Sequence, residues 1–161
     1  MKQEVSICWL RRDLRLKDNA ALYHALKGEY PVLLVFIFDT NILGDLHDKK
    51  DARVTFIYQQ LKEIELELQA KGSSILIKYG TPEKVWAEIL SEHSVMNVYT
   101  NHDYEPYASE RDDTLAEYLR SESIGFHTFK DQVVFEKNEI VKPDGKPYSI
   151  FTLISVSGIR N

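Results

Sequence analysis

The sequence has little cysteine and no hydrophobic run of membrane length. Cys8 is the only cysteine among 161 residues, so an internal disulfide framework is excluded and a reducing cytoplasm is the expected location. Because Cys8 stands in an apolar run, we expect a buried side chain rather than a reactive thiol. No run approaches the ~20 apolar residues that span a bilayer, and the N-terminus lacks a secretory signal pattern, so no membrane partner is expected.

Glycine-rich phosphate loops, an excess of basic charge and metal-ligand clusters are also missing. Neither G-x-x-x-x-G-K-[ST] nor G-x-G-x-x-G occurs, which argues against a P-loop NTPase and a nicotinamide dehydrogenase. The net charge is −5, whereas a domain that grips nucleic acid alone usually carries a basic face, so strong DNA binding by this chain alone is not expected. The five histidines are scattered and no Ser/His/Asp set occurs, so we expect no metal site and no serine-hydrolase site.

What the sequence does contain is a regular alternation of strand and helix patterns. Five strands interleaved with four helices predict a single α/β domain, a doubly wound five-stranded parallel sheet of the Rossmann-like type with helices on both faces. We expect this domain over residues 1–130, and a hairpin or linker over 131–161. The loops after strands one, two and four should meet at the carboxyl edge of the sheet, where a ligand is expected. The expected strands are 5–10, 32–38, 74–79, 95–100 and 125–129. The expected helices are 20–28, 52–71, one that begins at 82 and includes 90, and 106–122, and the three loops are 11–15, 39–53 and 101–107.

A charged segment, CWLRRDLRLKDN, directly follows the first apolar strand. Asp18 or Asn19 is expected to cap the next helix, and one interpretation of the segment is a self-paired Arg/Asp turn that only orients strand against helix. The segment also resembles the opening of the DNA photolyase and cryptochrome family, W-x-R-x-D-L-R-x-x-D-N. The fixed positions are filled by Trp9, Arg11, Asp13, Leu14, Arg15, Asp18 and Asn19.

A second charged segment, NHDYEPY, follows the fourth strand at 101–107. One interpretation is helix capping with surface charge, and the other is a polar rim over a flat ligand, with rings for stacking and acids as acceptors. The resemblance favours the rim, because the family carries N-x-[DE]-x-E-P-Y here, followed by Arg-Asp. The resemblance extends over residues 4–152. Further positions that match the family pattern are Arg53-Val54, Pro106, Tyr107, Arg111, Asp112 and the segment KPYSIFT at 146–152.

The resemblance implies the N-terminal antenna domain of a deoxyribodipyrimidine photo-lyase. In that family a larger helical domain binds FAD and damaged DNA, and light gathered by the antenna drives reduced FAD to split a cyclobutane pyrimidine dimer. This chain stops before that domain, so we expect no catalytic residue here, no FAD bound by this chain, and DNA contact only through the missing FAD domain. The alternatives are a cryptochrome-type blue-light photoreceptor domain and a free-standing nucleotide-binding module. The sequence does not indicate the oligomeric state.

The resemblance also indicates where an antenna would bind. Family members that use folate carry Asn-Glu where this chain has Tyr107 and Ala108, so a folate is less expected than a deazaflavin or flavin. An empty site is the second possibility, and Phe36 and Phe38 are equally suited to be core residues. The candidate antenna residues are Phe36, Ile37, Phe38, Asp39, Arg53, Asp103 and Glu105.

The tail, LISVSGIRN at 153–161, departs from the family pattern. One added base after Thr152, with codons that the genetic code permits, would restore Pro-Tyr-Leu-Arg-Lys-Trp-Asn, a segment of the family type. We therefore expect a frame shift after Thr152, with a diverged or trimmed tail as the alternative, and poor order in these residues.

Overall fold

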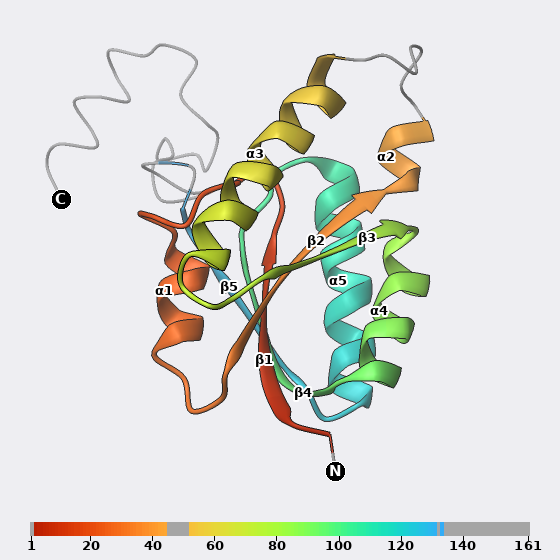
Figure 1. The fold of residues 1–161 in the computed structure, drawn as a ribbon. Helices are drawn as coiled ribbons and strands as arrows, with labels where there is room; N and C mark the ends of the chain where they lie inside the picture. Colours follow the sequence, from red (N-terminus) through yellow and green to blue (C-terminus); the bar gives the residue numbers. More distant parts are fainter. Residues whose placement is uncertain (1, 45–51, 132, 134–161) are drawn as a thin grey trace, which may run out of the picture. The chain divides into compact units, whose positions relative to one another are not determined.

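The protein is a five-stranded parallel sheet with helices on both faces, as the sequence predicts (Figure 1). The computed structural model describes residues 2–44, 52–131 and 133. The predicted linker over 131–161, with the 146–152 motif and the tail, therefore lies outside the described residues, except for Asp131 and Val133. In chain order the elements are β1 (Glu4–Leu10), α1 (Ala20–Leu26), β2 (Val32–Asp39), α2 (Thr40–Gly44), α3 (Ala52–Gln69), β3 (Ile75–Gly80), α4 (Pro82–Glu92), β4 (Ser94–Asn101), α5 (Pro106–Ser121) and β5 (Gly125–Phe129).

The strand order β3-β2-β1-β4-β5 places β1 at the centre of the sheet. Cys8 of β1 lies between Leu34 of β2 and Tyr99 of β4 in the strand register. Helices α1 and α3 pack on one face of the sheet, around Leu61 and Ile64, and helices α4 and α5 pack on the other, around Trp86. The chain therefore winds outward in two directions from β1, and the direction reverses between β1 and β4.

Local sequence signals explain most of the helix boundaries. Asn19 accepts a hydrogen bond from the Leu22 N–H at 3.0 Å, so of the two predicted candidates, Asp18 and Asn19, it is Asn19 that caps α1. Pro82 and Pro106 are the first residues of α4 and α5. At this position the backbone N–H has no partner within the helix, so proline removes no hydrogen bond. Among the described residues, no helix has both the length and the apolar character needed to cross a bilayer.

The segment after β2 corrects one expectation. The sequence predicts that the loop after β2 begins at Asp39, but α2 begins directly at Thr40. The Asp39 carboxylate accepts a hydrogen bond from the Asn41 N–H at 2.9 Å and so stabilises the first turn. A helix of five residues has no apolar periodicity, which is why the sequence pattern did not indicate it.

The Cys8 side chain is completely buried, and burial, followed by the nearby Asp13 charge, raises the pKa of its thiol. Since the thiolate is the reactive form, we expect no modification of the folded protein by a thiol-specific reagent at mildly alkaline pH. The same protein in denaturant should react rapidly and with a single stoichiometry. Spectrophotometric titration with a chromogenic disulfide distinguishes the two, and fast labelling of the folded chain would contradict the buried placement.

Candidate ligand site at the carboxyl edge of the sheet

The predicted loops after β1, β2 and β4 do converge at one edge of the sheet. Asn101, the last residue of β4, connects this edge to β1 and α1. Its side-chain amide donates to Asp13 Oδ2 at 2.6 Å and to Asn19 Oδ1 at 2.9 Å, and its Oδ1 accepts from the Ala21 N–H at 2.9 Å. Asn101, Asp13 and Asn19 are all buried. These motif residues therefore hold the loop after β1 in place instead of facing a ligand.

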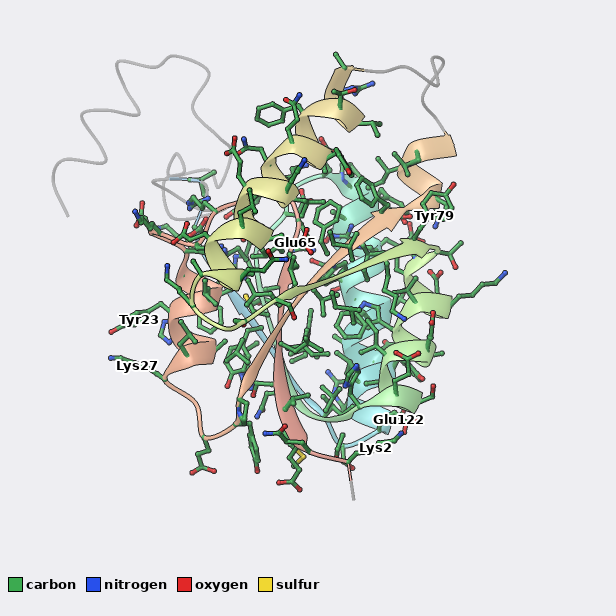
Figure 2. All side chains as sticks on the ribbon, viewed as in Figure 1. Lys2, Tyr23, Lys27, Glu65, Tyr79 and Glu122 are labelled. Carbon is green, nitrogen blue, oxygen red and sulfur yellow. The ribbon has the colours of Figure 1, made fainter. Side chains whose placement is uncertain are left out.

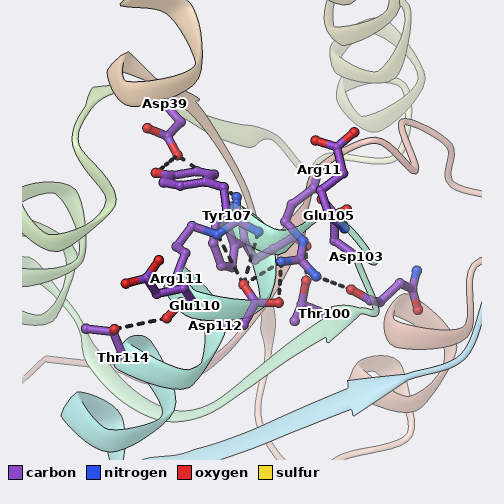
Figure 3. Close-up of polar contacts among 12 residues, drawn as sticks. Arg11, Asp39, Thr100, Asp103, Glu105, Tyr107, Glu110, Arg111, Asp112 and Thr114 are labelled. Carbon is purple, nitrogen blue, oxygen red and sulfur yellow. Dashed lines mark hydrogen bonds and ion pairs between the residues drawn. The ribbon is translucent and has the colours of Figure 1, made fainter. Parts of the chain in front are cut away.

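Two arginines share one aspartate beneath the same edge (Figure 3). Arg11 Nη1 donates to both carboxylate oxygens of Asp112 at 2.7 Å, and Arg11 also donates to the Asn101 carbonyl. Arg111 donates to Asp112 Oδ1 through Nε at 3.1 Å and Nη2 at 3.0 Å. Both guanidinium groups lie over the Trp9 ring, at 4.9 Å for Arg11 and 4.8 Å for Arg111. The family motifs at 9–19 and 101–112 thus form one buried ion cluster.

Tyr107 connects α5 to the end of β2. Its hydroxyl donates to Asp39 Oδ2 at 2.7 Å and accepts from the Asn41 side chain at 3.0 Å. Partial burial, followed by the hydrogen bond to Asp39, raises the pKa of the Tyr107 hydroxyl. Arg111 Nη1 lies 4.0 Å from Asp39 Oδ2, so the Asp39 carboxylate also forms an ion pair with α5. Asp39 therefore faces α5.

The exposed rim of the edge is an ion cluster that the sequence did not predict. Arg12 pairs with Glu105 at 2.5 Å and with Asp103 at 3.7 Å. The Asp103 side chain is nearly buried, whereas the Arg12 and Glu105 side chains are more than half exposed. Arg12 falls at a variable position of the first motif, so only the spatial approach of the two loops identifies it. Arg15, whose Nε donates to the Asp18 carbonyl at 3.0 Å, lies in the same loop as Arg12.

The structure separates the remaining candidate antenna residues. Phe36 is buried in the core beneath α1 and α3, and Ile37 is buried in the core of the opposite face. Phe38 is half-buried and meets the Phe36 ring edge-to-face, with centroids 5.0 Å apart. Arg53 is exposed in the first turn of α3. The core interpretation of Phe36 and Phe38 therefore describes Phe36, while Phe38 lies at the boundary and Ile37 is also a core residue.

An aromatic surface lies next to Asp39 at this edge. Tyr79, labelled in Figure 2 near the end of β3, pairs in register with Phe38 and is 73% exposed. Neighbours in register point to the same face of a sheet, so the Phe38 and Tyr79 rings share the face covered by α3. Phe56 of α3 is also exposed. The sequence pattern alone did not single out Tyr79, because an exposed tyrosine at a strand end is common.

Comparisons with known proteins identify the family and match this fold. The family model described as DNA photolyase matches residues 6–155. A deoxyribodipyrimidine photo-lyase of Synechococcus sp. is 32% identical over 143 residues, which is 89% of this chain and 29% of that protein. A bacterial class III photolyase from Agrobacterium tumefaciens has a TM-score of 0.86 at 25% identity, over 100% of this chain and 33% of that one. An archaeal photolyase from Sulfolobus tokodaii has a TM-score of 0.77 at 31% identity, over 86% and 32%.

These matches all cover a minor part of the longer protein. The chain spans about a third of the photolyases it matches, and the region shared is their N-terminal α/β domain. Cryptochromes are among the matches as well as photolyases. What the solved photolyases share with this chain is the fold of the α/β domain.

Proposed function

Because the chain belongs to the DNA photolyase family, we propose that it is the antenna-binding domain of a deoxyribodipyrimidine photo-lyase. In this proposal a helical domain, present in the longer relatives, holds FAD and contacts damaged DNA. Light absorbed by the antenna passes to reduced FAD, which splits a cyclobutane pyrimidine dimer. No residue of this chain takes part in the bond-breaking step, and its own role is to hold and orient the antenna.

The single observation that carries the antenna proposal is the aromatic surface at the carboxyl edge of the sheet. Tyr79 and Phe38 lie at the carboxyl ends of β3 and β2, while Asp39 ends β2 and Asp103 lies in the loop that follows β4. Flat ligands bind where rings stack on their faces and a few polar groups accept from their edges. The exposed Arg53 guanidinium adds a charged donor. This chemistry fits a flavin or deazaflavin.

The relatives support a flavin-type antenna over a folate. The Sulfolobus tokodaii photolyase is described as containing two FAD molecules, with the implication of a novel light-harvesting cofactor. The family resemblance implies that Tyr107 stands where folate-binding members have an asparagine, and the Tyr107 hydroxyl already binds Asp39 and Asn41. The group that would recognise folate is therefore replaced by a residue engaged within the protein.

The antenna proposal predicts that Arg53→Ala and Asp103→Ala each weaken dye binding. A charge-assisted hydrogen bond at a partly desolvated rim contributes roughly 1.5–3 kcal/mol, so each change should raise the Kd about tenfold or more. Titration of riboflavin monophosphate and of a deazaflavin, followed by dye fluorescence, measures the effect. Asp113→Ala, at an exposed position of α5, is the control and should bind like the unchanged protein. Equal affinity in all the variants would refute this placement of the antenna.

The cryptochrome-type photoreceptor remains the second candidate, because cryptochromes also match the chain. Repair of a cyclobutane dimer by the protein joined to its FAD domain separates the two. The free-standing nucleotide-binding module loses its basis, because the family match runs through nearly the whole sequence.

A further inference from the structure

The outer edge of β3 is unpaired within the part of the chain that the structure describes. The strand order β3-β2-β1-β4-β5 places β3 at one border of the sheet (Figure 1). Its sequence, ILIKYG, contains no proline, and its six residues pair with residues 34–39 of β2 without a break in register. An edge strand presents a row of unpaired N–H and C=O groups that another strand can bind. The backbone of β3 is therefore suited to pairing with one more strand.

β3 also lacks the charge that protects many edge strands. Natural edges are commonly kept apart by an exposed lysine, a proline or a bulge. The only charged residue of β3 is Lys78, and its Nζ lies 2.7 Å from Glu88 Oε1 and 3.4 Å from Glu92 Oε2, both on α4. The Lys78 side chain is only 17% exposed. Its charge is therefore compensated within the chain, and an approaching strand meets little repulsion from it.

Two apolar side chains of β3 are exposed beside this edge. Residues 75, 77 and 79 alternate along the strand and point to the face of the sheet covered by α3. Ile75 is buried, whereas Ile77 is 40% exposed and Tyr79 is 73% exposed. A strand added at the edge would cover part of both side chains. The free backbone groups and the apolar side chains thus favour the same kind of partner.

We propose that β3 pairs antiparallel with β3 of a second copy of this chain, about a two-fold axis at Ile77. Residues directly opposite each other in an antiparallel pair share a face of the sheet. Ile77 then lies opposite the partner's Ile77, Ile75 opposite the partner's Tyr79, and Leu76 opposite the partner's Lys78. The two five-stranded sheets become one continuous sheet.

The sequence of β3 favours this register and a second copy as the occupant. An axis at Lys78 would bring two ammonium groups opposite each other, and an axis at Leu76 would leave Tyr79 without a residue opposite it. The axis at Ile77 avoids both and pairs apolar side chains on the α3 face. Two-fold dimers are the commonest symmetric assemblies, because one self-complementary patch is enough to form them.

Sedimentation equilibrium of the whole chain measures the association. A single strand pair is a small interface, so we expect a reversible dimer with a Kd on the order of 10–100 μM. A chain that is still monomeric at about 1 mM overturns the proposal and indicates a different strand as the occupant of this edge. Dye titration reports the antenna site and sedimentation reports the strand pair, so either proposal can fail alone.

The axis at Ile77 is tested by two opposite charges at that position. Ile77→Lys and Ile77→Glu each bring like charges together in the dimer and should raise its Kd more than about tenfold. An equimolar mixture brings opposite charges together and should dimerise at least about tenfold more tightly than either variant alone. Leu26→Lys, at an exposed position of α1, is the control and should dimerise like the unchanged chain. Dimers of unchanged affinity in both single variants, or no gain in the mixture, overturn the proposal.

A cysteine at the axis provides a test that does not depend on charge. Ile77→Cys should form a disulfide-linked dimer under mild oxidation, because the residue at a two-fold axis lies opposite its own copy. Leu26→Cys should remain monomeric, and the unchanged chain provides no background because Cys8 is completely buried. Equal cross-linking of Ile77→Cys and Leu26→Cys, measured on a non-reducing gel, overturns the proposal.

Discussion

Replacing Asn101 by alanine should lower the free energy of unfolding by about 3–5 kcal/mol. The change leaves the buried Asp13 carboxylate without its 2.6 Å partner and the Ala21 N–H without an acceptor. Asp13 keeps the Asn19 amide at 3.0 Å and the Arg11 N–H at 2.8 Å but loses its shortest hydrogen bond. The Asn19 cap also loses the contact that connects it to β4. One side chain thus stabilises the end of β4, the loop after β1 and the start of α1 together.

Urea denaturation followed by tryptophan fluorescence measures this loss, because both tryptophans, Trp9 and Trp86, are buried. Asn41→Ala is the control, since it removes an exposed amide that donates only to the Tyr107 hydroxyl. We expect the control to change stability by less than about 0.5 kcal/mol. A loss below about 1 kcal/mol for Asn101→Ala would mean that the buried network contributes no more than an average hydrogen bond.

The second large effect is expected for Asp112→Ala, at about 3–5 kcal/mol of lost stability. Asp112 accepts from both Arg11 and Arg111, whose side chains are only 7% and 5% exposed. Removing the carboxylate leaves two nearly buried cations over the Trp9 ring, where cation–π attraction offsets only part of the cost. Thermal and urea unfolding measure the loss.

The neighbouring aspartate provides the control. Asp113 is exposed, so Asp113→Ala should change stability by less than about 0.5 kcal/mol. Asp112→Asn keeps one acceptor in the same volume and should fall between the two alanine variants. If the two alanine variants unfold at the same urea concentration, the ion cluster does not contribute to stability.

The sequence predicts the framework of this protein well, because long apolar patterns determine it. Both faces of β1 and β2 are buried, so their patterns are continuous, and the predicted element ends differ from the observed ones by one or two residues. The short α2 was not predicted, because its first turn depends on the Asp39 side chain and not on a repeated pattern.

The partners in the site could be predicted only in part. The family motifs identify Arg11 and Asp112, yet the pair is 101 residues apart in sequence, and neither motif states that the two meet. Arg12, the cation of the rim, fills a variable position in the motif. Trp86 looks like an ordinary core residue in the helical pattern, because a sequence shows that a ring is buried but not whether its N–H finds an acceptor. Hydrophobic residues recur with a period that is visible in the sequence. The partner of a polar side chain depends on which segments the fold brings together, and the sequence does not show this.

The central place of β1 also has a consequence for how the chain is made. Glu4 pairs with Ser94 and Cys8 with Tyr99, so one edge of β1 pairs with β4. Because β1 is synthesised first, this edge stays unpaired until β4 has been synthesised. Until then β1, β2 and β3 can associate as a partial sheet in which the largely apolar β1 is an additional unpaired edge strand. Such edges favour aggregation, and pairings between distant segments form slowly. The yield of soluble protein should therefore depend on how quickly translation reaches Asn101, and slow codons between β3 and β4 should reduce it.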